Sequence, residues 1–271
     1  MMGQQSRFLK IVALLGFVFL YAPIVSLVIF SFNESKLVTV WGGFSTKWYA
    51  ELFRDPQILE AAWVSIKIAL ISATIAVVIG TVGSFVLIRF KKFRSKGLLS
   101  MMITAPLVMP EVIIGLSLLL LFVAMQGVIG WPGGRGMMTI IIAHSTFGAA
   151  YAAVVIQSRL VDMDLSIEEA AQDLGAKPVR VFFDVTLPVI APALLSGWLL
   201  VFTLSLDDLV IASFVSGPGA STLPMVVFSK VRLGVSPDVN ALATIIIGIV
   251  SLGIIAAALQ ISRSKKHGAE R

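Results

Sequence analysis

Six long apolar stretches, each free or nearly free of charged residues, dominate this chain of 271 residues. They cover residues 11–33, 63–88, 97–125, 137–157, 192–215 and 239–261. A helix that crosses the hydrocarbon core of a bilayer needs roughly 20 such residues. Only 13% of the residues are charged, whereas roughly a quarter are charged in soluble domains. The sequence therefore predicts an all-α integral membrane protein with six transmembrane helices.

Lysine and arginine are unequally distributed over the segments that join these helices. With the N-terminus inside, fourteen of them fall in inner segments and six in outer ones. Short loops rich in these residues stay on the cytoplasmic side. We therefore expect a bacterial inner-membrane protein with both termini in the cytoplasm. The net charge of +6 is attributed to this orientation and not to a nucleic-acid partner.

The longest inner connection, residues 158–191, carries helix signals that a passive linker does not need. Ser166 and Glu169 fit a capping box that begins a short helix through Leu174. Gly175 follows, and glycine readily adopts the positive φ that ends a helix.

A second short helix is predicted directly after this one. Pro178 suits its first position, Phe182 and Phe183 give it an aromatic face, and Pro188 is expected to end it. An aromatic helix in a loop that faces water indicates a partner or a packing site. The alternative is that the loop folds against the protein's own inner surface.

The run Glu169-Ala170-Ala171, then Gly175 after three residues, then Leu187-Pro188, resembles the EAA loop of permease subunits in binding-protein-dependent ABC importers. Val185 stands where that pattern usually has Ile. The resemblance implies a type I importer permease fold, in which this loop couples the permease to a cytoplasmic ATPase. The residues to which it assigns this role are Glu169, Ala170, Ala171, Gly175, Leu187 and Pro188, and the aromatic face of Phe182 and Phe183 would add an apolar contact.

The sequence contains no G-x-x-x-x-G-K-[ST] phosphate-binding loop. We therefore expect this chain to bind no cofactor, and ATP and Mg²⁺ to bind to a partner subunit. The chain itself is not predicted to be an enzyme.

Ionisable residues inside predicted spans are costly and usually functional. Asp207 and Asp208 lie in the fifth span, where Ser205 shares a helix face with Asp208 and Thr203 shares another with Asp207. Acids so placed are expected to face a cavity or a bundle interior. Each has the structural alternative of a helix-terminus hydrogen bond or an ion pair.

Glu111 is predicted near the middle of the third span, directly after Pro106 and Pro110, which can open the helix locally. Acids beside interrupted helices favour a cationic cargo. His144 is predicted to be a satisfied interior histidine and not a metal ligand, because no second metal-binding residue type stands at a ligand spacing beside it.

Trp48 lies in the first outer loop with Trp41 and Tyr49. Aromatic residues there usually mark the membrane interface, but they can also contact an alkylammonium cargo through cation-π interactions. The predicted substrate pathway therefore contains Glu111, Ser205, Asp207, Asp208 and Trp48.

Further runs of sequence are similar to the second permease subunit of bacterial polyamine importers, and most similar to that of the putrescine importer. They are Tyr21-Ala22-Pro23, Ser31-Phe32-Asn33, Ser35-Lys36-Leu37-Val38-Thr39-Val40-Trp41, Ala105-Pro106-Leu107-Val108-Met109-Pro110, Leu204-Ser205-Leu206-Asp207-Asp208, Ser213-Phe214-Val215, Leu223-Pro224 and Asn240-Ala241-Leu242-Ala243-Thr244. The resemblance implies four kinds of partner: a second, similar permease, two copies of a cytoplasmic ATPase, a periplasmic polyamine-binding protein and the lipid bilayer. The expected cargo is putrescine or spermidine.

We expect a single membrane domain over residues 1–271, with a transport core of five helices at 62–261 and the coupling loop at 158–191. Two other functions are open. A secondary transporter for organic cations, working alone, would use the acids as a proton relay. A membrane-embedded hydrolase would use Asp207 and Asp208 as an acid pair, but adjacent acids on one helix point about 100° apart.

Overall fold

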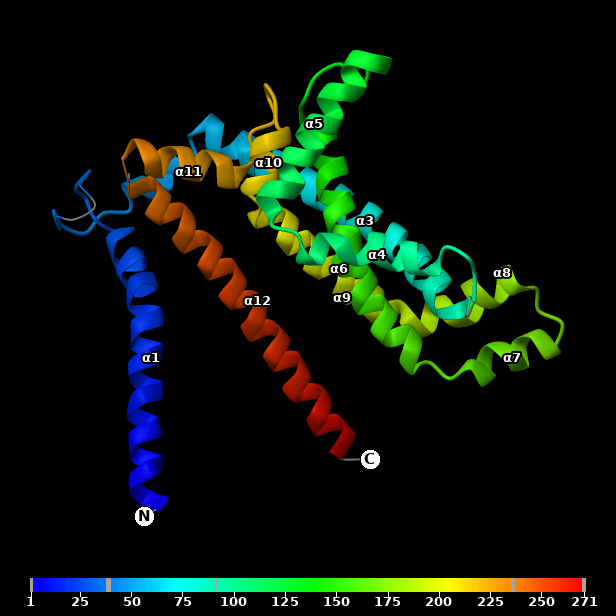
Figure 1. Ribbon diagram of the computed structural model, residues 1–271. Helices are drawn as coiled ribbons and strands as arrows, with labels where there is room; N and C mark the ends of the chain where they lie inside the picture. The colour runs from blue at the N-terminus through cyan, green and yellow to red at the C-terminus, as the bar shows by residue number, and fades with distance from the viewer. Residues whose placement is uncertain (1, 38–39, 91, 235–236, 270–271) are drawn as a thin grey trace. The chain divides into compact units, whose positions relative to one another are not determined.

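A computed structural model of the chain describes residues 2–37, 40–90, 92–234 and 237–269. In the first helix the side chains are described from residue 8, and in the last helix through residue 252 and at 255. The regular elements of this described part are helices (Figure 1). Contacts divide the chain into two units: residues 60–226 form one, and residues 1–59 with 227–271 form the other.

Within the described residues, five helices are long and apolar enough to cross a membrane: Phe8–Phe30 within α1 (Met2–Phe30), α3 (Pro56–Arg89), α5 (Glu111–Ile129), α6 (Met137–Asp162) and the helical run Pro178–Asp207. The predicted sixth span, residues 239–261, coincides with α12 (Pro237–Ala269). Its side chains at 253, 254 and 256–261 lie outside those described. The count of six therefore stays a prediction, whereas the all-helical membrane architecture is confirmed.

Unit 60–226 is built around α3, α6 and α9 (Leu187–Asp207), which run side by side in Figure 1. Their backbones approach closely because small residues lie between them. A Cβ atom on Gly80 of α3 would lie 3.0 Å from the backbone nitrogen of Ala153 in α6. Ser84 of α3 donates a hydrogen bond to the Ala153 carbonyl at 3.0 Å. Close packing of this kind is typical of helices within a membrane, where burial of apolar surface does not drive association.

The third predicted span is two helices and not one. α4 (Lys96–Val108) continues through Pro106, and the backbone becomes extended at Met109 and Pro110 before α5 begins at Glu111. Pro110 lacks the N–H that would continue the helix, and its ring disfavours a helical residue before it. Glu111 is therefore the first residue of α5 and lies at a break of the kind that the two prolines were expected to open.

The fifth predicted span is also interrupted. α9 ends at Asp207, Asp208 has extended backbone angles, and a short helix α10 (Val210–Val215) follows. Asp208 Oδ1 accepts a hydrogen bond from the Ile211 amide at 3.3 Å, and Oδ2 accepts one from the Ala212 amide at 2.8 Å. The two acids therefore lie at a helix break, not in the interior of a helix as the sequence pattern indicated.

The loop predicted to face the cytoplasm contains α7 (Leu165–Asp173). Its N-cap is Asp164, whose carboxylate accepts a hydrogen bond from the Ser166 amide at 2.9 Å and whose pKa this bond lowers. The predicted N-cap, Ser166, is therefore wrong by two residues. The helix begins earlier because the Asp164 carboxylate accepts the amide hydrogen bond of the first turn. Gly175 adopts φ +87°, as expected for the residue that ends this helix.

The second predicted helix does not end at Pro188. α8 (Pro178–Val181) passes into a π-helical turn η1 (Phe182–Thr186) and then into α9 without a break. Pro188 is the second residue of α9, inside this continuous helical run, where a proline removes a backbone hydrogen bond. The wider π turn changes the hydrogen-bond register just before the proline. Pro188 therefore joins two helical segments instead of separating them.

Unit 1–59 with 227–271 contains α1, α2 (Lys47–Leu52), part of α11 (Leu223–Leu233), and α12. The loop that follows α1 is organised by Asn33, which is fully buried. The Asn33 side chain donates to the Val40 carbonyl at 2.8 Å and accepts from the Gly42 amide at 2.8 Å. One side chain thus closes the loop that follows α1.

Candidate functional site: the inner segment and the polar sites of the helices

α7 is mostly exposed, although its sequence is not uniformly polar. Glu169 and Ala170 are exposed, and Ala171 is half-buried. Figure 1 shows α7 and α8 beyond one end of α6 and α9. The residues expected to contact an ATPase are thus on an accessible projection of the fold.

Large apolar side chains are exposed around this projection. They are Leu165, Ile167, Leu174, Val179 and Phe183, and Leu174 retains 90% of its accessible surface. Soluble surfaces rarely leave such a group of apolar side chains uncovered, which indicates a protein-binding surface. The alternative, in which the loop packs on the protein's own inner surface, holds for another face of the segment, where Glu168 and Val181 are buried.

The two phenylalanines have different environments. The Phe182 ring contacts Phe85 of α3 edge to face, with 5.0 Å between ring centroids, and it is half-buried. Phe183 contacts Phe182 at 5.2 Å and is exposed. Leu187 is half-buried and Pro188 exposed at the start of α9. Phe182 therefore anchors the segment to the helices, and Phe183 stays available at the surface.

Sequence reasoning missed Glu168, which is the buried residue of α7. Its Oε1 atom lies 3.0 Å from Arg89 Nη2 and accepts a hydrogen bond from Thr186 Oγ1 at 2.6 Å. Glu168 precedes the EAA pattern by one position, and its partners are 79 and 18 residues away in the chain. The apolar pattern of the loop contains no signal for this ion pair.

A second polar site surrounds His144 of α6, which is fully buried. Its Nδ1 lies 2.7 Å from Ser205 Oγ, and its Nε2 lies 3.1 Å from Asp208 Oδ2. We call these three residues the His144 cluster. The cluster is satisfied if His144 donates from Nε2 to the carboxylate and accepts at Nδ1 from the serine hydroxyl. His144 is thus the satisfied interior histidine that the sequence predicted.

The His144 cluster bears on two predicted pathway residues. Ser205 and Asp208 do share one side of the chain, but both point to His144 and are buried. Asp208 also accepts the two backbone bonds at the start of α10, which is the structural alternative that the sequence left open. Asp207 and Glu111, in contrast, are exposed in unit 60–226 and make no hydrogen bond of this kind.

Trp48 has a structural role in its own unit. It is buried, and its indole Nε1 donates a hydrogen bond to the Asn33 carbonyl at 2.6 Å. The Lys47 ammonium lies 4.7 Å from the centroid of its ring. A cation-π contact therefore exists at Trp48, and the cation is a neighbouring lysine.

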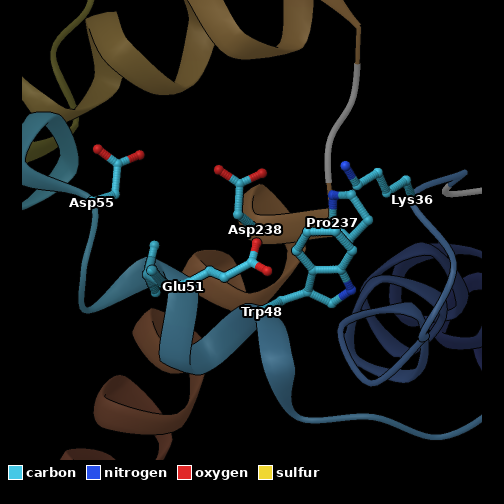
Figure 2. Close-up of a pocket in the computed structure, with 7 residues that line it drawn as sticks. Lys36, Trp48, Glu51, Asp55, Pro237 and Asp238 are labelled. Carbon is cyan, nitrogen blue, oxygen red and sulfur yellow. The ribbon is translucent and has the colours of Figure 1, made fainter.

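Trp48 also borders a pocket of about 500 Å³, with Lys36, Glu51, Leu52, Asp55, Pro237 and Asp238. Figure 2 shows the indole ring beside Pro237 and the carboxylates of Glu51, Asp55 and Asp238 around the pocket. The Lys230 ammonium donates to Asp55 Oδ2 at 2.7 Å and to Asp238 Oδ2 at 2.8 Å. One ammonium therefore links the two carboxylates.

This ionic arrangement shifts two pKa values in opposite directions. Burial alone would raise the pKa of Asp55, but the Lys230 hydrogen bond and charge, with the amides of Ile58 and Gln57, lower it overall. Burial alone would lower the pKa of Lys230, and its bonds to Asp238 and Asp55 raise it. Both groups are held in their charged forms around neutral pH.

Solved structures identify the class of fold. A chain of a bacterial ABC transporter involved in the import of the acidic polysaccharide alginate aligns with a TM-score of 0.71 at 18% identity, covering 94% of this chain and 96% of that one. A chain of the MetNI methionine ABC transporter aligns with a TM-score of 0.58 at 16% identity over 76% of this chain and 95% of that one. The chain therefore has the type I ABC importer permease fold, as predicted.

Sequence comparison gives the family. The chain belongs to the family of binding-protein-dependent transport system inner membrane components, whose model matches residues 76–263. It is 62% identical over 248 residues to the "Putrescine transport system permease protein PotI" of Escherichia coli strain K12, covering 92% of this chain and 88% of that protein. It is 39% identical over 252 residues to the "Spermidine/putrescine transport system permease protein PotC" of the same strain, covering 93% and 92%. These findings confirm the predicted family and a multi-pass membrane protein.

Proposed function

We propose that this chain is a transmembrane permease subunit of an ATP-driven polyamine importer, with putrescine or spermidine as cargo. The observation that carries the proposal is the 62% identity to a putrescine permease over 92% of the chain. The exposed apolar projection around α7 supports it, because a subunit moved by a separate ATPase needs an accessible contact surface.

The proposed assembly pairs this chain with a second homologous permease, two copies of a cytoplasmic ATPase and a periplasmic polyamine-binding protein. A solved relative of the fold is an alginate transporter in complex with its periplasmic protein, which supports the last of these partners by analogy. ATP and Mg²⁺ would bind to the ATPase, and this chain would hold no cofactor. The coupling loop at residues 158–191 would then face the cytoplasm together with both termini.

The proposed pathway uses the accessible acids Glu111 and Asp207 as direct contacts for an ammonium group. A carboxylate at a helix break can receive a cation without losing helical hydrogen bonds. Asp208 and Ser205 would border the pathway through the His144 cluster, and Trp48 would act at its outer entrance. The core of residues 62–261 would carry the contacts of Glu111, Ser205, Asp207 and Asp208, and Trp48 precedes this core in the same membrane domain.

Reconstitution of the full importer in liposomes tests this function. Labelled putrescine and spermidine should enter only when ATP is supplied on the side of the membrane where the ATPase lies. Uptake should also require the binding protein. The variants Glu111→Gln and Asp207→Asn should each lower uptake by about tenfold or more, which corresponds to about 1.4 kcal/mol of lost stabilisation of the cation. Asp162→Asn, an exposed position at the end of α6, is the matched control and should transport normally.

Uptake by the isolated chain in response to a pH gradient would contradict the proposal and favour the stand-alone secondary transporter. If both acid variants transport at the wild-type rate at equal protein levels, Glu111 and Asp207 do not contact the cargo. The proposed importer function would not be affected by that result.

A further inference from the structure

Glu168 is a buried carboxylate in a helix that is otherwise open to solvent. It retains 7% of its accessible surface, whereas Glu169 beside it is exposed. A buried carboxylate remains charged only when it is paired and hydrogen-bonded. The adjacent glutamates of α7 therefore have different tasks: one points into the protein and the other is free for a partner.

The partners of Glu168 come from separate helices. Arg89 is the last residue of α3, and its Nη2 atom forms the ion pair with Glu168. The Nη1 atom of Arg89 also donates to the Leu160 carbonyl, in the last turn of α6, at 3.4 Å. Thr186 lies in the π-helical turn directly before α9. The Glu168 carboxylate thus connects α7 to the end of α3 and to the start of α9, and Arg89 extends the connection to the end of α6.

Apolar packing shields this connection from water. Leu160, Ile156 and Ile190 are fully buried in the cluster that also contains Ala73, Ala76 and Val201. Phe85 and Ile88 of α3 pack against it, and Phe85 contacts Phe182 of the inner segment. The side chains of Arg89 and Glu168 retain only 10% and 9% exposure, so solvent screens their interaction weakly.

A second ion pair in the same segment provides a contrast. Arg180 Nε lies 3.0 Å from Asp184 Oδ2, but these side chains are 78% and 59% exposed and only four residues apart. An exposed pair of this type contributes little and joins no other helix. The two pairs differ in burial and in whether they connect separate helices.

We propose that Arg89, Glu168 and Thr186 form the rigid connection through which movement of α7 reaches α3 and α9. This inference rests on the proposed coupling of α7 to an ATPase. Glu168 is then a positioning residue for energy coupling, and it touches neither cargo nor nucleotide. A displacement of α7 is passed directly to the end of α3 and the start of α9, because a buried ion pair with a shared hydrogen bond cannot stretch without exposing an unpaired charge.

The ratio of putrescine imported to ATP hydrolysed, in purified reconstituted importer, tests the connection. In Glu168→Gln the ATPase should co-purify in normal amount and hydrolyse ATP, but the ratio should fall about five- to tenfold. Thr186→Val, which removes one hydrogen bond and keeps the shape, should lower the ratio about two- to threefold. Asp184→Asn is the matched control and should keep the wild-type ratio.

A double-variant cycle separates coupling from general stability. Once Glu168 is neutral, adding Arg89→Gln should change the ratio little further, because the interaction is already lost. A normal ratio in assembled Glu168→Gln and Thr186→Val complexes would overturn the inference, as would independent, additive effects of Arg89 and Glu168. Should Glu168→Gln fail to assemble, Thr186→Val alone decides. Wild-type importer without ATP-dependent uptake would overturn the proposed function, and this inference with it.

Discussion

His144 makes two buried hydrogen bonds to side chains that are distant in the sequence. It is fully buried and joins α6 to the break between α9 and α10 through Ser205 and Asp208. We predict that His144→Leu destabilises the protein by about 1–3 kcal/mol, because it leaves a buried carboxylate and a hydroxyl without their partner. Thermal unfolding in detergent measures this change.

The control for His144 is on the same helix. Thr146 is exposed and bonds only to the Ile142 carbonyl of its own helix, so Thr146→Val should unfold at the wild-type temperature. Equal unfolding temperatures for His144→Leu and wild type would show that the His144 cluster contributes no stability.

The ionic arrangement of Asp55, Lys230 and Asp238 leads to a pH prediction. The lowered pKa of Asp55 means that its contribution to stability is present above the unfolded value of about 3.9 and is lost as pH falls through the folded value. The raised pKa of Lys230 means that its contribution is present below about 10.4 and is lost as pH rises through the folded value. Stability from these groups should therefore be flat around neutral pH.

Lys230→Met should lower the free energy of unfolding by about 1 kcal/mol at neutral pH, because the three side chains are partly exposed. The difference from wild type should shrink below about pH 4, as the pH falls from the unfolded pKa of Asp55 towards its lowered folded pKa. Unfolding temperatures recorded from about pH 3 to 9 measure it, with Lys92→Met at an exposed position as control. A difference that stays constant down to pH 3 would mean that packing, and not charge, explains the loss.

For single residues, the sequence predicted the chemical role of several side chains but not which residues they contact. Hydropathy identified Asp208 and His144 as unusual within spans, and their interaction crosses 64 residues of sequence. Glu168 was overlooked for the same reason, because an ion pair between distant helices follows from packing and leaves no local pattern. Gly175 was predictable, since a helix that ends in a positive φ strongly favours glycine.

The packing of α6 against α9 depends on Gly148. A Cβ atom there would lie 2.5 Å from Val201 Cγ1 and 3.3 Å from Ala76 Cβ. Gly148→Ala should destabilise the protein by about 1–3 kcal/mol, because these helices must move apart or repack. Thermal unfolding and the yield of folded protein after detergent extraction measure the effect.

The second substitution Val201→Ala should restore part of the stability lost in Gly148→Ala, because it removes the clashing methyl groups. Gly127→Ala on α5 is the matched control: nothing lies within 4 Å of its added methyl group, and it should be neutral or slightly stabilising. If the double variant is no more stable than Gly148→Ala, the close approach is not the cause.

Among the elements, hydrophobic length predicted the spans well and their interruptions poorly. A local opening of the helix at Pro110 was expected. The sequence did not predict that a new helix would begin at Glu111. The break at Asp208 contains no proline or glycine, and it exists because the carboxylate caps α10 while His144 holds it. Pro188 shows the opposite case, in which a π-helical turn allows a helix to continue past a residue that usually begins or ends one.

For the whole molecule, the orientation in the membrane is the main prediction to test. The chain has no cysteine, so single cysteines can be introduced without background labelling. In intact cells with a permeable outer membrane, a membrane-impermeant maleimide should label Thr46→Cys in the outer loop. Gln172→Cys in α7 should react only after the inner membrane is opened. Both positions are exposed, so access to the reagent and not burial decides the result.

The reverse labelling pattern would invert the topology that the lysine and arginine distribution predicts. It would also place α7 on the side of the membrane where no ATPase could reach it.

The unbroken helical run from Pro178 to Asp207 has a mechanical consequence. Its 30 residues form a rod about 45 Å long at 1.5 Å per residue. One end carries the exposed aromatic ring of Phe183, and the other carries the acid next to the His144 cluster. A swing of about 5° around the first end would displace the second by about 4 Å. Such a rotation would hardly disturb the packing near Phe183. At Asp207 it would be large enough to admit or block a group the size of an ammonium.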